Sequence, residues 1–376
     1  YAIMKIGFDA KRLFNNFTGL GNYSRFVVDT LLEAGTTDNY CLYTPKIKDR
    51  PETKRYLQDP RLKIITPPSW MKPSPLAAIW RSTLPISAKE FSSLDVYHGL
   101  SHELPMGIPS HVKTIVTIHD LIFLRYPQFY SRFDVMMHHQ KVKHACRVAD
   151  RIVAVSEQTA KDIIQFLNAD PAKIKVIYQG CHRQFRHKHR PEEIAAVRKK
   201  YDLPERYILM VGSIESRKNA ITLLKAFAML PKDGRPGLVL VGKGTTYLDQ
   251  VKSTIAGLHI EKEVALIHHA AFSDLPAIYQ GATVFAYPSL FEGFGIPIIE
   301  AIESGIPVLT SKGSCFAEAG GPHAWYADPQ LPEEWASHLK EILGSDNQQR
   351  IASQQEHVLK FRPEQNRGNL LNSYRF

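Results

Sequence analysis

Short hydrophobic runs rich in Val and Ile alternate with amphipathic segments of helical length along almost all of the 376 residues. This alternation is typical of parallel β-sheets whose strands are joined by helical crossovers. One ordinary core takes roughly 150 residues, so a chain of this length exceeds a single domain. The sequence therefore predicts an α/β protein with two domains of similar size.

The alternation stops once and then starts again. A basic, irregular stretch, Tyr178–Pro191, interrupts it and is the predicted linker. Before the linker, strands are expected near Lys5–Ala10, Cys41–Thr44, Lys63–Thr66, Asp95–His98, Thr114–Ile118, Ile152–Val155 and Lys173–Ile177, with helices near Asn22–Glu33, Phe133–Ala149 and Glu157–Leu167. After it, strands are expected near Tyr207–Val211, Leu238–Val241, Val264–Ile267, Val284–Tyr287 and Val308–Thr310, with a final helix at Asn366–Tyr374. Each half thus predicts a doubly wound sheet.

Composition narrows the class of protein. Hydrophobic residues make up 44% and charged residues 22%, which favours a compact fold over disorder. The four cysteines, none of them in a CxxC pair, predict neither a zinc ribbon nor a redox motif, and reduced thiols in the cytosol are expected. They are Cys41, Cys146, Cys181 and Cys315.

Neither secretion nor membrane spanning is expected. Tyr1–Lys5 lacks an apolar signal region, and no run of about 18 apolar residues occurs. A cytoplasmic location follows. The formal charge of +10 leaves nucleic acid, anionic lipid and an anionic substrate open as partners. Because no recognised nucleic-acid motif is present, nucleic acid is not the expected partner.

The segment Val284–Glu300 carries the most chemical information. A buried strand ends there, a glycine-bearing loop follows, and a helix begins, an arrangement that binds ligands at the carboxyl end of a parallel strand. Gly293 and Gly295 allow backbone amides to approach a ligand closely, and Pro297 suits the first helical turn. Glu292 is expected in the loop.

Glu300 is expected in the first turn of that helix. Two carboxylates directed at one site are poor partners for phosphate but good acceptors for the hydroxyls of a sugar and a ribose. The residues alone leave a second interpretation open, in which Glu300 complements the helix dipole and Glu292 is a solvated loop residue.

The same segment resembles the Glu-x7-Glu motif of family 4 glycosyltransferases, including the Gly-Phe-Gly that precedes Ile296 and the continuation to Val308. The resemblance implies that Glu292 contacts hydroxyls of a donor sugar and that Glu300 contacts the ribose. It also implies that backbone amides meet the sugar or the diphosphate. These amides belong to Phe294, Gly295 and Ile296.

A second site follows the first strand after the linker. The segment Tyr207–Asn219 places Arg217 and Lys218 just before a helix, where both cations could reach a diphosphate and stabilise a departing nucleoside diphosphate. The alternative is a solvated basic pair. Similarity to the family's Gly-x4-Arg-Lys-Asn segment favours function, although Ser213 stands where many relatives carry an arginine.

The first half supplies two further candidates. Gly19 and Gly21 are expected before a helix. One interpretation is that they serve an ordinary turn. Their placement also resembles the family's N-terminal glycine loop, which implies that they face the donor phosphates. His119 ends a buried strand, and its His-Asp segment is similar to the family's, which implies a role near the donor sugar. A structural histidine, with Asp120 capping the next turn, is the alternative.

The stretch Pro67–Arg81 mixes proline, aromatic and basic residues. It is expected either to bind acceptor or a membrane surface, or to pack Trp70 and Trp80 locally beneath a loop.

The resemblance spans nearly the whole chain and implies the GT-B fold, in which two Rossmann-like domains face a central cleft. The expected boundaries are 1–180 for the acceptor-side domain, 181–360 for the nucleotide-sugar domain, and 361–376 for a helix that packs back on the first domain. Retention of the donor's anomeric configuration is also implied. No metal is expected, because Arg217, Lys218 and helix amides can offset phosphate charge and no Asp-x-Asp site is present.

The expected activity is hexose transfer in polysaccharide biosynthesis. GDP-mannose is the first choice of donor and UDP-sugars the next, and a glycan or a lipid-linked sugar is the expected acceptor. Peripheral association with the inner membrane surface stays open. A nucleotide-sugar epimerase of the same fold is the alternative enzyme.

Overall fold

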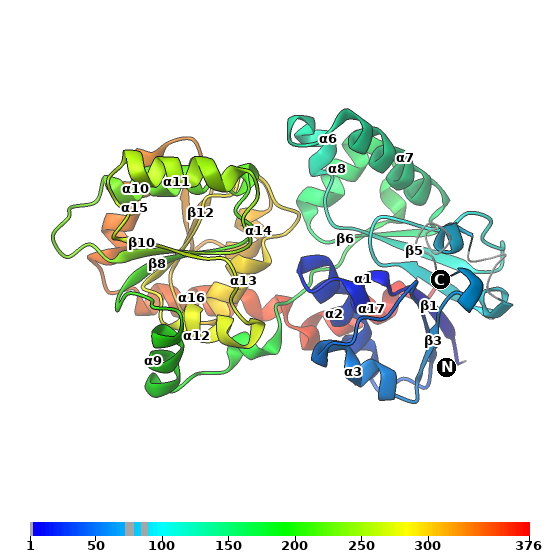
Figure 1. Ribbon diagram of the computed structural model, residues 1–376. Helices are drawn as coiled ribbons and strands as arrows, with labels where there is room; N and C mark the ends of the chain where they lie inside the picture. Colours follow the sequence, from blue (N-terminus) through cyan, green and yellow to red (C-terminus); the bar gives the residue numbers. More distant parts are fainter. Residues whose placement is uncertain (1–2, 72–78, 84–88) are drawn as a thin grey trace. The chain divides into compact units, whose positions relative to one another are not determined.

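The computed structural model describes residues 3–71, 79–83 and 89–376, which form two compact units (Figure 1). Unit 1 comprises Tyr1–Gln179 together with Pro363–Phe376, and unit 2 comprises Gly180–Arg362. The chain therefore leaves unit 1 once and returns to it. Within the described residues, every helix is too short or too polar to span a lipid bilayer.

Unit 1 has a parallel sheet with strand order β3-β2-β1-β4-β5-β6-β7 in its described part. The strands are β1 (Lys5–Asp9), β2 (Asn39–Tyr43), β3 (Leu62–Ile65), β4 (Val96–Gly99), β5 (Lys113–Ile118), β6 (Arg151–Ala154) and β7 (Ile174–Val176). Helices cover both faces (Figure 1). One face carries α1 (Lys11–Asn15), α2 (Gly19–Glu33), α3 (Pro51–Gln58) and α17 (Pro363–Ser373); the other carries α6 (Ile122–Arg125), α7 (Arg132–Val148) and α8 (Glu157–Leu167).

Unit 2 repeats this architecture with strand order β10-β9-β8-β11-β12-β13 among its described residues, again all parallel. The strands are β8 (Tyr207–Val211), β9 (Gly237–Val241), β10 (Val264–Ile267), β11 (Val284–Tyr287), β12 (Val308–Ser311) and β13 (Trp325–Ala327). One face carries α10 (Ala220–Ala228), α11 (Tyr247–Gly257) and α15 (Pro332–Leu343); the other carries α9 (Pro191–Lys200), α12 (Leu275–Gln280), α13 (Ile296–Glu303), α14 (Phe316–Gly320) and α16 (Gln348–Val358).

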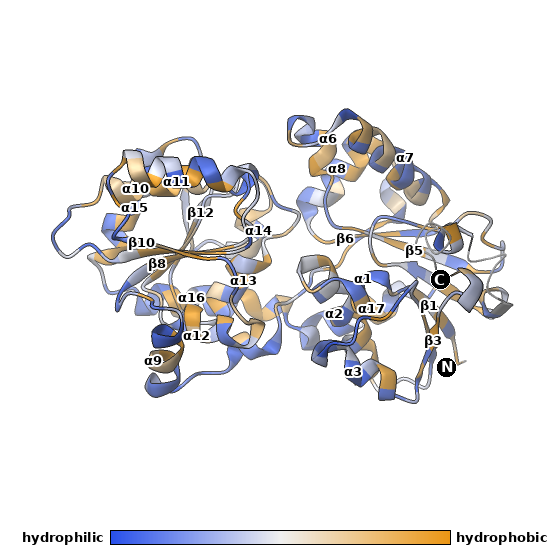
Figure 2. Ribbon diagram, viewed as in Figure 1, coloured by the Kyte–Doolittle hydropathy of each residue, from blue (hydrophilic) through white to orange (hydrophobic). Residues whose placement is uncertain are grey.

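The strands form because helices on both faces keep water from them, so each strand is a continuous hydrophobic run. All four residues of β11 are buried, as are four of the five residues of β8. Figure 2 shows the strands of both units mainly in the colours of hydrophobic residues, whereas polar residues gather on the outer sides of helices. Each unit thus has its own core around its sheet.

The strand order of each sheet reverses direction at one place. In unit 2 this happens between β8 and β11, and in unit 1 between β1 and β4. At such a point the connections that leave two neighbouring strands pass to opposite faces of the sheet, and ligands of doubly wound proteins bind beside the carboxyl ends of those strands. The loops after β8 and β11 are therefore the first place to look for a site in unit 2.

Helix α17 belongs to unit 1, where it packs against α2. Two side chains from the sheet of unit 1 hold the residues around its end. The Tyr374 hydroxyl lies 2.7 Å from Nδ1 of His98, and both side chains are buried. The Arg151 guanidinium donates to the carbonyl oxygens of Asn372 (3.1 Å) and Ser373 (2.5 Å). The chain after residue 362 is therefore an integral part of unit 1.

The expected α/β class with two parallel sheets is confirmed. Each expected strand lies within two residues of an observed one, and α8 has the bounds that the sequence predicts. Several elements were not expected, including α1, α3 and α6 in unit 1 and β13 and α9 in unit 2. Strand β13 is only three residues long and closes one edge of its sheet, and α9 begins at Pro191, where the predicted linker ends.

The start of α2 differs from the expectation. The helix begins at Gly19 and not at Asn22, so Gly19 and Gly21 lie within its first turn and not in a loop before it. The helix begins earlier because a side chain from outside it caps its first turn. The Asn16 side-chain oxygen accepts the backbone N–H groups of Thr18 (3.0 Å) and Gly21 (3.1 Å), which an α-helix cannot satisfy by itself at its first turn.

Replacing Gly21 by Ala should destabilise unit 1 strongly. A Cβ atom at Gly21 would lie 1.7 Å from the backbone oxygen of Asn16, whereas one at Gly19 would meet nothing within 4 Å. We expect Gly21→Ala to lower the free energy of unfolding by about 2–4 kcal/mol, and Gly19→Ala to change it by less than about 1 kcal/mol. Urea unfolding followed by circular dichroism measures both. Equal effects of the two variants would contradict the close contact.

Candidate active site

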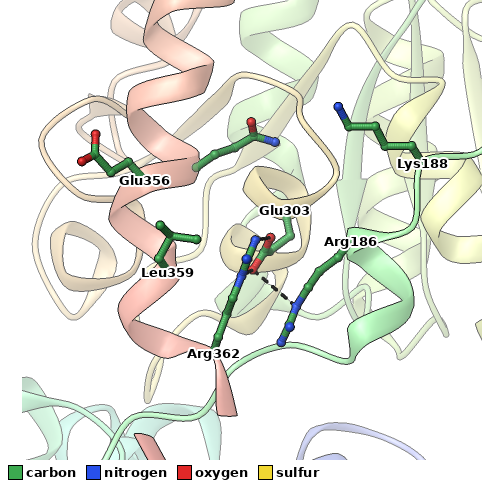
Figure 3. Close-up of a pocket in the computed structure, with 7 residues that line it drawn as sticks. Arg186, Lys188, Glu303, Glu356, Leu359 and Arg362 are labelled. Atoms are coloured by element: carbon green, nitrogen blue, oxygen red, sulfur yellow. Dashed lines mark hydrogen bonds and ion pairs between the residues drawn. The ribbon is translucent and has the colours of Figure 1, made fainter. Parts of the chain in front are cut away.

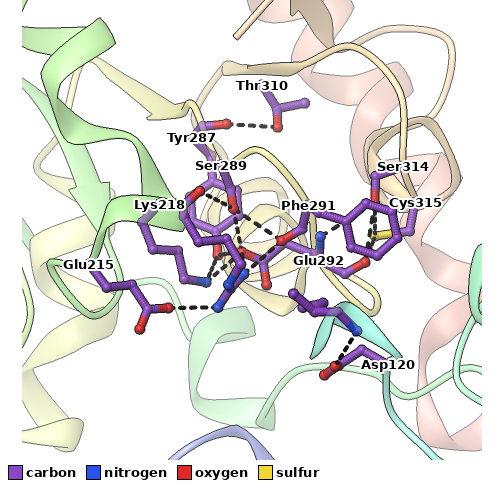
Figure 4. Close-up of polar contacts among 12 residues, drawn as sticks. Asp120, Glu215, Lys218, Tyr287, Ser289, Phe291, Glu292, Thr310, Ser314 and Cys315 are labelled. Atoms are coloured by element: carbon purple, nitrogen blue, oxygen red, sulfur yellow. Dashed lines mark hydrogen bonds and ion pairs between the residues drawn. The ribbon is translucent and has the colours of Figure 1, made fainter. Parts of the chain in front are cut away.

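Three of the residues predicted for the site lie together in unit 2, and Figure 4 labels two of them, Lys218 and Glu292. Arg217 and Lys218 belong to a 3-10 turn, η6 (Ser216–Lys218), which follows β8, and Glu292 lies in the loop after β11. Nζ of Lys218 is 2.5 Å from Oε1 of Glu292, and Nη1 of Arg217 is 2.8 Å from the same oxygen. Because β8 and β11 are neighbours in the sheet, the loops at their carboxyl ends meet.

Two hydroxyl groups complete the contacts of Glu292. Ser289 donates from 2.6 Å and Tyr287 from 3.0 Å, again to Oε1, so one oxygen accepts all four hydrogen bonds. Among the described residues, no hydrogen bond reaches the other oxygen, Oε2. The carboxylate is thus held in one orientation while half of its acceptor capacity stays available.

Burial makes these charges depend on one another. The exposed fractions of the Arg217, Lys218 and Glu292 side chains are only 16%, 10% and 12%. Burial alone would raise the pKa of Glu292, but Arg217 and Lys218 outweigh it and hold that pKa at about 2. Burial lowers the pKa of Lys218, and the Glu292 carboxylate opposes this. Glu215, 2.7 Å from Nη2 of Arg217, brings the cluster to two cations and two carboxylates.

Further hydrogen bonds join the loop after β8 to the loop after β11. The backbone N–H of Leu290 donates to the carbonyl oxygen of Arg217 (2.9 Å). The Asn219 side chain donates to the carbonyl oxygens of Pro288 (3.2 Å) and Pro329 (2.7 Å), while its own backbone takes the left-handed conformation (φ 57°) that Asn tolerates better than most residues. Sequence reasoning missed this role of Asn219, although its place directly before α10 was a usable signal.

Helix α13 begins directly after the glycine loop. Gly295 has φ 95°, a conformation that favours glycine, and Ile296 is the first helical residue. The ring of Phe294 packs edge-on against Phe361 (5.1 Å between the ring centroids). The expectation for Glu300 was wrong in one respect. It is the fifth residue of α13, beyond the first turn, because the helix begins only at Ile296.

Glu300 has surroundings of its own. Its side chain is buried and accepts a hydrogen bond from the Tyr279 hydroxyl (2.9 Å). Burial raises the pKa of Glu300 to about 7, and the Tyr279 hydrogen bond opposes this only in part. Among the described residues, Glu300 and Glu292 share no hydrogen-bond partner. The two glutamates therefore differ in charge near neutral pH.

The predicted residues of the first half belong to unit 1. His119 is buried, and its Nε2 lies 2.9 Å from the carbonyl oxygen of Leu100. Since a carbonyl only accepts, Nε2 carries the proton and Nδ1 keeps a lone pair. Burial, together with the neighbouring His102, lowers the pKa of His119 to about 3. The imidazole is therefore neutral at pH 7. The neighbouring Asp120 accepts the backbone N–H of Ile122 (3.1 Å), as a turn cap does.

A hollow in unit 2 carries no predicted site residue. It has a volume of about 300 Å³ and is lined by Arg186, Lys188, Glu303, Gln355, Glu356, Leu359 and Arg362 (Figure 3). Its floor is an ion pair in which Arg362 grips both oxygens of Glu303 (2.8 and 2.7 Å).

In the stretch Pro67–Arg81, residues 72–78 lie outside the described residues. Trp80 is buried and lies near Tyr43 (ring centroids 6.5 Å apart), whereas Trp70 is 71% exposed.

Two family profiles match the chain along most of its length. The profile described as Glycosyltransferase Family 4 matches residues 19–185, and that described as Glycosyl transferases group 1 matches residues 193–357. The chain belongs to the family 4 glycosyltransferases. It is therefore a retaining glycosyltransferase that uses a nucleotide-sugar donor, and its two parallel α/β units are those of the GT-B fold.

Individual relatives agree with this assignment. The chain is 26% identical over 366 residues to O-antigen chain mannosyltransferase B of Escherichia coli, with 93% of each chain covered. It is 29% identical over 240 residues to O-antigen chain mannosyltransferase RfbU of Salmonella typhimurium, with 62% of each covered. The crystal structure of Anabaena Alr3699/HepE in complex with UDP and glucose superposes with a TM-score of 0.75 at 18% identity, over 98% of this chain and 99% of that one.

Replacing Glu300 by Gln should stabilise the protein only at high pH. Folded Glu300 keeps its proton up to a pH of about 7, whereas the unfolded side chain loses it near 4.5. Stability is consequently lost as the pH rises from 4.5 through about 7, and the uncharged glutamine avoids this loss. We expect nearly equal apparent Tm values at pH 5 and a Tm roughly 3–6 °C higher for Glu300→Gln at pH 8.

Scanning calorimetry at both pH values checks this. The exposed Glu333, changed to Gln, is the matched control and should give no such difference. If the Tm change in Glu300→Gln is the same at pH 5 and pH 8, the raised pKa is wrong.

Proposed function

We propose that this glycosyltransferase transfers a hexose, with mannose as first choice, from a nucleoside-diphosphate sugar to a glycan or lipid-linked acceptor. One observation carries the proposal: a buried carboxylate with a free acceptor oxygen lies beside two cations at the reversal of the strand order in unit 2. A nucleotide sugar offers hydroxyls for such a carboxylate and a pyrophosphate for such cations. The two relatives named as O-antigen mannosyltransferases support mannose, and thereby a GDP-linked donor.

The cations take the pyrophosphate in this proposal. Arg217 offers a planar fork whose arms now hold Glu215 and Glu292, and either arm can exchange a carboxylate for a phosphate oxygen. Lys218 supplies a compact charge that has little water around it. As the bond to the sugar breaks, negative charge grows on the leaving diphosphate, and these fixed charges stabilise it without a divalent metal.

The acceptor groups take the hydroxyls. Oε2 of Glu292 accepts a hydroxyl of the donor sugar, and Glu300, once deprotonated, accepts a hydroxyl of the ribose. The first N–H groups of α13 have no acceptors within their own helix, so those near Gly295 and Ile296 suit the diphosphate or the sugar. In this proposal the backbone amide of Phe294 also contacts the diphosphate or the sugar.

The residues of unit 1 take part without transferring a proton. His119 is neutral, so its Nδ1 lone pair serves as an acceptor for a donor-sugar hydroxyl and not as an acid. Gly19 carries no side chain at the start of α2, which leaves room for a phosphate to approach the first turn. The N–H of Gly21 is already taken by the Asn16 side chain, and Gly21 contributes by allowing that close contact.

The transfer step needs no covalent enzyme intermediate. The bond between the anomeric carbon and the phosphate oxygen breaks, and the acceptor oxygen bonds to that carbon on the same face. The acceptor proton passes to the departing phosphate oxygen. A glycosyl-enzyme adduct trapped and detected by mass spectrometry would overturn this route.

Substituting Glu292 by Gln should reduce transfer. Loss of the fixed carboxylate removes a donor contact and leaves Lys218 with a weaker partner, so kcat/KM should fall by about 10²–10³. The exposed Glu333→Gln is the matched control. Because a buried cation without its partner can destabilise the fold, a milder variant is also needed.

Ser289→Ala removes a single hydrogen bond to Oε1 and should lower kcat/KM about tenfold with a near-normal Tm. Full activity in both Glu292→Gln and Ser289→Ala would refute the role of Glu292.

A screen against nucleotide sugars tests the donor. A ligand that binds the folded protein raises its Tm, and more so the more tightly it binds. We expect GDP-mannose to raise the Tm more than UDP-, ADP- or dTDP-sugars in a thermal-shift series. A larger rise in Tm with a UDP-sugar than with GDP-mannose would refute GDP-mannose as the donor. Incubating the best donor without acceptor should give slow hydrolysis, whereas epimerised donor would point to the alternative enzyme.

A further inference from the structure

Two imidazoles and a carboxylate gather in unit 2, apart from the residues assigned to transfer. They belong to His187, His189 and Glu193. The backbone is extended at His187 (φ −70°, ψ 123°) and at Arg190 (φ −70°, ψ 153°), and side chains of extended backbone alternate in direction. Lys188, between the two histidines, accordingly lines the hollow in Figure 3 together with Arg186, the last residue of a 3-10 turn, while the two histidines gather with the carboxylate.

The three groups are close enough to share one ion. One ligand atom from each residue lies within 4.8 Å of the other two. Nδ1 of His189 is 3.8 Å from Oε2 of Glu193, and the two imidazole centroids are 4.9 Å apart. Ligand atoms held tetrahedrally at about 2.0–2.1 Å from a zinc ion lie roughly 3.3 Å from one another. Closing the remaining gap takes only small side-chain rotations.

The backbone that carries the histidines is held by a third element. Gln280 at the end of α12 donates to the carbonyl oxygen of His187 (2.6 Å) and accepts the backbone N–H of His189 (2.9 Å). Glu193 lies in the first turn of α9, where its Oε2 accepts the backbone N–H of Arg190 (2.8 Å). The backbone of His187 and His189 is therefore fixed to α12, and Glu193 is fixed at the start of α9. A metal ion would need to order little of the chain when it binds.

We propose that His187, His189 and Glu193 bind one divalent transition-metal ion of the zinc class, with water completing the coordination. Neutral imidazole nitrogens and a carboxylate oxygen are ligands that zinc accepts, whereas magnesium and calcium prefer oxygen alone. The exposed Arg190 guanidinium, 3.5 Å from Oε1 of Glu193, and the nearby Lys188 oppose a cation. The site is therefore weaker than a closed four-ligand site.

The ion has a structural role in this proposal. Its ligands include none of the residues assigned to the donor. It would tie the segment 187–189 directly to α9, in addition to the contacts that Gln280 provides. Metal binding and activity are thus separate readouts, and the proposal does not depend on the identity of the sugar donor.

Calorimetric titration of the tag-free full chain with ZnCl₂ is the test. We expect saturable binding of one equivalent by the wild-type chain and a Tm that rises with zinc concentration. Glu193→Gln should weaken binding about tenfold. The double variant His187→Ala/His189→Ala should weaken it about a hundredfold, with an unchanged circular dichroism spectrum because His187 is exposed and Gln280 holds the backbone of both residues.

His338→Ala is the matched control. His338 also has a carboxylate neighbour, Glu341 at 3.4 Å, but it belongs to no such group of three ligands among the described residues. Its variant should bind zinc as the wild type does. Absence of saturable binding by the wild-type chain would overturn the proposal. So would unchanged affinity in the double variant, which would mean that the zinc binds elsewhere.

Discussion

The structure of the candidate site depends on a buried carboxylate that faces two buried cations. Glu292, Arg217 and Lys218 are each largely removed from water, and the cost of burying each charge is offset by the opposite charge beside it. Removing one member of such a group typically costs about 3–5 kcal/mol because it leaves an uncompensated charge. This mutual dependence fixes the loop after β8 against the loop after β11.

The same physics acts in opposite directions on two glutamates that are eight residues apart. Burial disfavours the charged form of both, but Glu292 has two cations beside it, whereas Glu300 has only a hydroxyl. One is therefore a permanent anion, and the other gains or loses its proton near neutral pH. A loop and the helix that follows it thus provide two acceptor groups whose charges are set by different neighbours.

Much of the fold followed from the sequence because its strands are covered on both faces and are continuously hydrophobic. The meeting of Arg217, Lys218 and Glu292 was also within reach, since all three follow strands at their carboxyl ends. The hydroxyls of Tyr287 and Ser289 at Glu292 were missed because the sequence does not show how the loop after β11 folds back over the end of its own strand. The roles of all the site residues in transfer remain predictions.

Local errors have local causes. The start of α2 was placed too late because the cap comes from the Asn16 side chain, and glycines there were taken as a sign of a loop. Strand β13 was missed because three residues give too short a periodic pattern, and α9 because the basic linker continues directly into it.

The return of the chain to unit 1 affects how the protein is made. Unit 2 is continuous in sequence, whereas Nδ1 of His98 in unit 1 finds its partner only at the Tyr374 hydroxyl. On the ribosome, the first unit to begin synthesis is therefore the last that can complete its packing. Until residues 363–376 have emerged, the helix face that α17 covers stays open to solvent or to chaperones.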